Sequence, residues 1–115
     1  MIRTLGPQVD LDGLVADALE EGREVHLVRA AASKQATLEA FAEALSFPGW
    51  FGHNVDALAD CLDHLLAKAT APWELILDEA AVLRRADDRA YDGIRAVLAD
   101  LALRHPSSNL TVIDR

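Results

Sequence analysis

Three aspartates in the middle of the chain have the spacing needed to act together. Asp56, Asp60 and Asp63 stand at i, i+4 and i+7, so at about 100° per residue they fall on one side of a helix. Like charges four residues apart cost a helix roughly 0.2–0.5 kcal/mol. Such a row of carboxylates suits a basic partner, although a merely solvated acidic face is also common.

The segment around these aspartates predicts the helix that positions them. Pro48 and Gly49 break any preceding helix, and Asn54 is a good N-cap residue. The side opposite the aspartates is apolar, as expected for a helix packed on a core; it contains Val55, Leu58, Leu62, Leu65 and Leu66. Trp50 and Phe51 lie in the turn before this helix, where large rings are costly unless they are covered or bind something.

The rest of the chain predicts a small α/β domain. Short β-favouring runs predict strands at 24–29, 73–78 and 109–113. Apolar residues at helical spacing lie between them, and the alternation predicts a three-stranded, mainly parallel sheet packed with helices. Residues 1–22 contain a further amphipathic stretch, which we expect to form a helical extension packed on the domain of residues 23–115.

Composition limits the function classes. The chain has 115 residues and a net charge of −8, which opposes direct binding to nucleic acid or anionic membranes and favours basic partners. One cysteine excludes an intramolecular disulfide. The pattern of the chain indicates neither secretion nor a membrane-spanning run, so we expect neither. We therefore expect a cytoplasmic protein.

The stretch of residues 48–62, PGWFGHNVDALADCL, resembles the barstar family of small intracellular inhibitors of microbial ribonucleases. The predicted order of strands and helices also resembles this family, so the likeness covers the chain except for its first ~22 residues. It implies a barstar-like fold and a non-enzymatic inhibitor of the antitoxin or immunity type, which plugs the active site of a basic secreted ribonuclease with an acidic helix.

The resemblance also implies roles for individual residues. Asp60 would be the main mimic of the RNA phosphate, and Asp56 would be a second acid facing an arginine or lysine of the enzyme. The adjacent contact loop would contain Trp50, Phe51, Gly52 and Asn54. Asp92, near the start of the last long helix, matches a further acid of the family.

Three positions depart from the family's namesake, which has a tryptophan at the position of Ala59, a glutamate at that of His53 and a threonine at that of Asp63. One aromatic anchor and one charge of the family interface are therefore missing here. Asp63, in contrast, lengthens the acidic row. These departures concern the identity of the enzyme more than the mode of binding.

Other readings of the same residues remain open. An interaction module of this fold could bind a basic protein that is not a nuclease. Cys61 and His64 have the spacing of a nucleophile and a base, although a buried thiol is the usual case. Asp60 and His64 could share a divalent metal, but two ligands are few for a dedicated site. We expect no enzyme activity, no metal and no cofactor, and a monomer when the protein is free.

Overall fold

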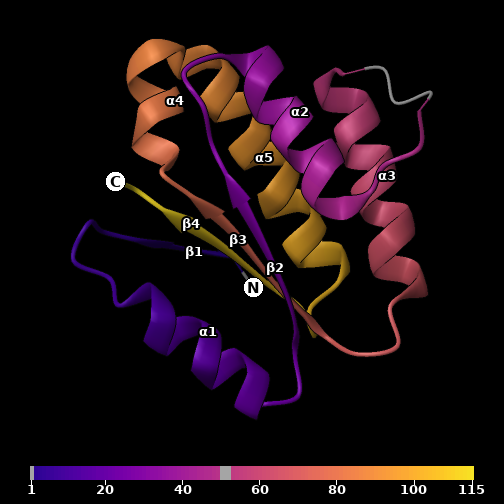
Figure 1. Ribbon diagram of the computed structural model, residues 1–115. Coiled ribbons are helices and arrows are strands. Elements are labelled where there is room, and N and C mark those ends of the chain that lie inside the picture. Colours follow the sequence, from indigo (N-terminus) through magenta and orange to yellow (C-terminus); the bar gives the residue numbers. More distant parts are fainter. Residues whose placement is uncertain (1, 50–52) are drawn as a thin grey trace.

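The computed structural model describes residues 2–49 and 53–115. Helices and strands alternate along most of the chain (Figure 1). The strands are β1 (Ile2–Leu5), β2 (Glu24–Arg29), β3 (Trp73–Asp78) and β4 (Asn109–Ile113). The helices are α1 (Leu11–Glu20), α2 (Lys34–Leu45), α3 (Val55–Lys68), α4 (Ala80–Ala86) and α5 (Asp88–Arg104).

The strands form one parallel sheet in the order β1-β4-β3-β2. The expected α/β class and parallel sheet are confirmed, but the expected number of three strands is wrong. Ile2–Leu5 forms a fourth strand, which pairs with β4 in the register Ile2↔Leu110 to Leu5↔Ile113. Four residues are too few to show a strand pattern by themselves, and this strand is defined by a partner at the far end of the chain.

The main core lies between the sheet and the helices α2 to α5. Alternate residues of the central strands point into it, among them Leu75, Leu77, Leu110 and Val112, which are almost completely buried. Figure 1 shows these four helices on one side of the sheet and α1 by itself on the other. On this side of the sheet, α3 packs beside α5 and also contacts α2.

The second face of the sheet carries the intervening residues. Ile76 and Ile113 are fully buried there, together with the polar side chains of Glu74 and Thr111. Since α1 is the helix on this side (Figure 1), residues 2–20 bring both an edge strand and the cover for this face. The buried Ala18 of α1 is consistent with such packing.

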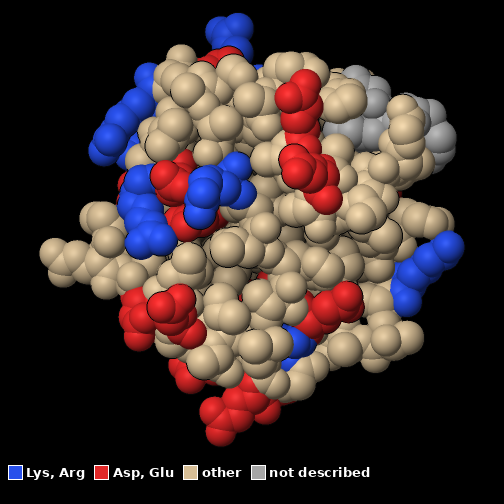
Figure 2. All heavy atoms as spheres, viewed as in Figure 1, with Lys and Arg blue, Asp and Glu red and all other residues tan. Residues whose placement is uncertain are grey.

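Charged residues gather at the carboxyl ends of the strands. Arg115 binds the buried Asp78 at the end of β3 through two hydrogen bonds of 2.9 and 3.0 Å. Arg29 Nε lies 2.7 Å from Glu79 Oε2. Figure 2 shows basic and acidic side chains next to one another near this end of the sheet. Both of these arginines are thus paired with a carboxylate at this end of the sheet.

No helix in the described part of the chain is long and apolar enough to cross a membrane.

Candidate functional site

The acidic helix α3 begins where its cap predicts. Asn54 has extended backbone angles, and its side-chain oxygen accepts a hydrogen bond of 2.7 Å from the N–H of Ala57. This bond satisfies one of the four N–H groups that a helix start leaves without a partner. Leu58 and Leu62 are fully buried, so the apolar side of α3 packs on the core and fixes which side faces the solvent.

Asp56 and Asp60 both lie on the solvent side of α3, and both are exposed. Within residues 2–49 and 53–115 neither has an ion-pair partner. Asp56 is in the first helical turn, where the helix dipole stabilises a negative charge. Asp60 lies one turn further along, so its charge is available to a partner without the loss of an internal ion pair.

Asp63 is in a different situation from the other two acids. Its Oδ1 lies 2.7 Å from Nε2 of His105 and 3.4 Å from Arg104 Nη1. The hydrogen bond with His105 lowers the pKa of the Asp63 carboxyl, and the charge of Arg104 contributes in the same direction. Asp63 therefore ties α3 to the end of α5, and its side chain remains 40% exposed.

Asp92 is exposed on α5, the helix that packs beside α3. A Cβ atom placed on its neighbour Gly93 would lie 3.9 Å from Val55 Cγ2. The first turn of α3 is thus close to the α5 residue next to Asp92. The structure brings the start of the acidic helix and the region of the predicted additional acid together.

The predicted contact residues Trp50, Phe51 and Gly52 lie outside the described residues. On one side they are preceded by Phe47, which packs against the core. On the other side, His53 has a left-handed φ of 51° and leads directly into the cap Asn54. The described residues on the two sides of this gap thus follow the end of α2 and lead into the start of α3.

The sequence matches the model of one protein family, described as Barstar (barnase inhibitor), over residues 23–113. The chain belongs to the barstar family. The match includes α3 and α5 with their aspartates, and it begins after α1, so β1 and α1 lie outside it. No curated protein sequence matches the chain. Members of the barstar family inhibit ribonucleases by protein–protein binding and are not enzymes.

The surroundings of Cys61 fit this family assignment. Cys61 is buried, and its burial, followed by the charge of Asp60, raises the pKa of the thiol. A raised pKa disfavours the thiolate that a nucleophile needs.

Among the described residues, no group of three or more His, Cys, Asp or Glu side chains could hold a metal ion.

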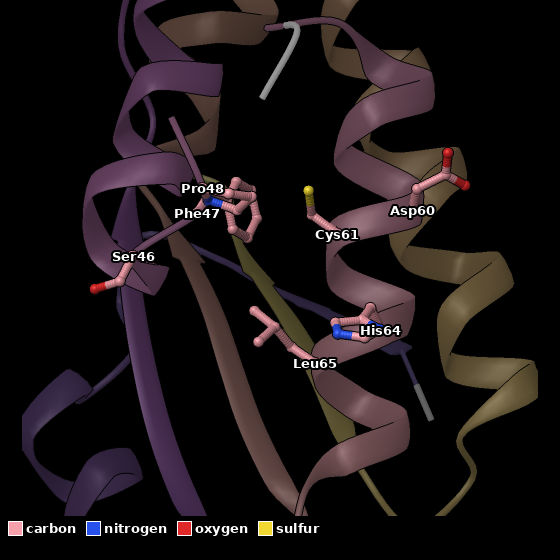
Figure 3. A pocket seen from close by; sticks show the side chains of 7 residues that line it. All are labelled: Ser46, Phe47, Pro48, Asp60, Cys61, His64 and Leu65. Atoms are coloured by element: carbon pink, nitrogen blue, oxygen red, sulfur yellow. The ribbon is translucent and has the colours of Figure 1, made fainter. Parts of the chain in front are cut away.

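One feature of this barstar-family surface was not found from the sequence. A pocket of about 290 Å³ lies between the end of α2 and the outer side of α3. Figure 3 shows Phe47, Pro48, Cys61 and Leu65 around it, with His64 on the next part of its wall. Ser46, which has a left-handed φ of 54°, ends α2 and starts the turn toward α3. Pro48 and Gly49 predicted the end of the preceding helix, but the pocket beyond it depends on how α2 and α3 pack.

Proposed function

We propose that this chain inhibits a microbial ribonuclease by covering its cationic active site with the solvent side of α3 and the loop that precedes it. The proposal rests mainly on the exposed Asp60, which lies within the family-matched residues 23–113. A ribonuclease must be positively charged where it holds RNA phosphates. A rigid helix that presents a carboxylate to that place competes with the substrate.

The electrostatics of the chain support this mode of binding. The net charge is −8, and Asp56 and Asp60 have no internal cation among the described residues to displace. Complementary charge accelerates the encounter of two proteins and selects against partners of the wrong sign. Asp60 would be the central contact, with Asp56 and Asp92 beside it. Trp50, Phe51, Gly52 and Asn54 would form the adjoining contact loop.

In this proposal the chain acts by occlusion and not by catalysis. It needs no cofactor or metal, and its partner is a basic secreted protein. A cell that makes such a ribonuclease must protect its own RNA before secretion. We therefore place the inhibitor in the cytoplasm of the producing cell, as a monomer until it meets the enzyme.

An inhibition assay against a panel of secreted basic ribonucleases tests the proposal, with RNA hydrolysis as the readout. We expect at least one enzyme to be inhibited by a one-to-one complex. Asp60→Ala should weaken the inhibition roughly 10- to 100-fold, the usual effect of losing a hydrogen bond to a charged group. Asp17→Ala is the matched control, because it removes one exposed acid from α1 on the other side of the sheet.

Two results would refute the proposal. One is that no ribonuclease of the panel is inhibited, and the other is that Asp60→Ala inhibits as well as the parent. Capture of partners from a lysate of the native cell adds a further test, in which a nuclease should dominate. If the dominant partner is a basic protein that is not a nuclease, the chain is an interaction module of the barstar fold with a different role.

A further inference from the structure

The outer side of β2 carries backbone groups that the sheet does not use. In the order β1-β4-β3-β2 this strand lies at an edge, with β3 as its neighbour. Ala30, directly after the strand, donates its N–H to Asp78 on the β3 side. Because alternate residues of a strand bond to the same neighbour, Val25, Leu27 and Arg29 turn their N–H and C=O groups away from β3. Within residues 2–49 and 53–115, no backbone hydrogen bond reaches these groups.

This edge lacks the features that usually protect an edge strand. Such strands are commonly very short, bulged, or interrupted by lysine or proline. β2 has six residues, contains neither lysine nor proline, and pairs with β3 in continuous register. Of its two charged ends, Arg29 is paired with Glu79, and Glu24 accepts a hydrogen bond of 3.1 Å from Trp73 Nε1. Both charges are therefore bound within the molecule, and residues 25–28 between them contain no acid, lysine or arginine.

Leu27 is an exposed apolar side chain in the middle of this edge. It is 42% exposed, and among the described strand residues it is the one large hydrophobic side chain that is exposed. Its partner in the register is Ile76, so Leu27 lies on the second face of the sheet. Figure 1 shows β2 in front of the other strands, with α1 on one side and α2 on the other. A strand added here would continue the sheet and cover Leu27.

Acidic side chains flank this edge on both sides. Figure 2 shows them over α2 above the edge and over the end of α1 below it, with a largely uncharged surface between. Glu39 and Glu43 are exposed on α2, and Glu20 and Glu21 are exposed at the end of α1. Basic side chains lie to the left in the same view, where Arg29 already has a carboxylate partner. Together with the net charge of −8, these surroundings favour a basic segment and oppose a second copy of this chain.

We infer that the outer edge of β2 binds an extended segment of a basic partner protein, which adds a further strand to the sheet. The backbone of this segment pairs with Val25, Leu27 and Arg29, an apolar side chain covers Leu27, and lysine or arginine at its ends faces the acids of α1 and α2. Strand addition of this kind derives affinity from main-chain hydrogen bonds and specificity from alternate side chains. The site shares no residue with α3 or the loop before it, so the inference does not rest on the proposed function.

A peptide titration of the ¹⁵N-labelled protein tests the inference. The probe is a short peptide of alternating valine and threonine, with lysine at each end and both termini blocked. It should protect the N–H groups of Val25, Leu27 and Arg29 from hydrogen exchange. The N–H groups of His26 and Val28 face β3 and should gain little protection. This alternation distinguishes strand pairing from binding to a surface of side chains.

Two altered peptides separate backbone pairing from charge. N-methylation of alternate amides removes the donors and should weaken binding about ten-fold or more, as expected when more than one hydrogen bond is lost. Glutamate in place of the terminal lysines should weaken binding about five-fold. Equal binding of the N-methylated peptide, equal binding of the acidic peptide, or no protection of the three outward N–H groups would each overturn the inference.

A substitution in β2 tests the same contact from the other side. Leu27→Pro removes an N–H that makes no bond to β3, and edge strands tolerate proline at such positions. It should weaken binding of the lysine peptide about ten-fold, while Leu27→Ala, which retains the N–H, should weaken it less. Leu103→Ala removes a leucine that is 82% exposed on α5 and should bind like the parent.

The inference fails if Leu27→Pro retains the amide spectrum of a folded protein and binds the peptide as tightly as the parent. If Leu27→Pro does not fold, the comparison of the lysine peptide with its N-methylated form on the parent protein decides the question.

Discussion

Arg3 in β1 and Glu74 in β3 form an ion pair across the strand that separates them. Arg3 Nη2 lies 3.1 Å from Glu74 Oε1, and Thr111 of the intervening β4 donates a hydrogen bond of 2.8 Å to Glu74 Oε2. Glu74 is only 2% exposed. The first strand therefore brings the cation that compensates a buried carboxylate in the middle of the sheet.

Removing this cation should destabilise the fold. Arg3→Met leaves the buried Glu74 with the Thr111 hydroxyl and Asn109 amide as its remaining partners. Unpairing a buried charge costs about 3–5 kcal/mol, but Arg3 is 34% exposed, and solvent screening reduces the effect. We expect the free energy of unfolding to fall by about 2 kcal/mol, measured by urea denaturation.

A double variant provides the control for this pair. Arg3→Met combined with Glu74→Gln removes both charges and should be more stable than Arg3→Met alone, because no unpaired buried charge remains. Equal stability of Arg3→Met and the parent would contradict the role given to the pair.

Asn54 should have separable structural and binding roles. Asn54→Ala removes the cap of α3 and should lower the free energy of unfolding by about 1 kcal/mol. Asn54→Ser retains a capping oxygen and should stay close to the parent in stability. If Asn54 also contacts the ribonuclease, Asn54→Ser will bind less tightly despite its normal stability. Urea denaturation and inhibition assays on both variants separate the two roles.

Asp63 should contribute less to partner binding than Asp60. Its carboxylate is already engaged with His105 and Arg104, so part of its charge is compensated inside the molecule. Asp63→Ala should reduce protection of the last turn of α5 from hydrogen exchange, while weakening ribonuclease inhibition less than Asp60→Ala. A larger loss of inhibition for Asp63→Ala than for Asp60→Ala would reverse this order.

Asp78 should make stability depend on pH in the acid range. Its hydrogen bonds with Arg115 lower the pKa of the Asp78 carboxyl below its ordinary value of 3.8. The folded state therefore binds this proton more weakly than the unfolded state. The resulting stabilisation is present above pH 3.8 and is lost as the pH falls through the lower folded pKa.

The variant Asp78→Asn tests this assignment. Its free energy of unfolding should change less between neutral and acid pH than that of the parent, measured by urea denaturation at each pH. Asp17→Asn removes an exposed acid from α1 and should keep the parent's slope. An unchanged slope in Asp78→Asn would show that another group is responsible.

Much of the fold could be predicted because it depends on local patterns. The strands at 24–29, 73–78 and 109–113 have the predicted bounds, since each is a short β-favouring run between helical segments. The cap at Asn54 was also predicted, because it needs only a suitable side chain before an apolar period. β1 was missed because its stability comes from pairing with β4 and from the contact of Arg3 with Glu74, 71 positions away.

The sequence by itself determined that Asp56, Asp60 and Asp63 share the polar side of one helix, because helical geometry assigns each residue a direction. It could not distinguish their surroundings. His105 lies 42 positions from Asp63, and only the packing of α5 beside α3 brings the two together. Tertiary structure therefore decided that Asp63 is paired with side chains at the end of α5, while Asp56 and Asp60 have no ion-pair partner among the described residues. It also created the pocket lined by Asp60, because ion pairs and cavities depend on distances between separate elements.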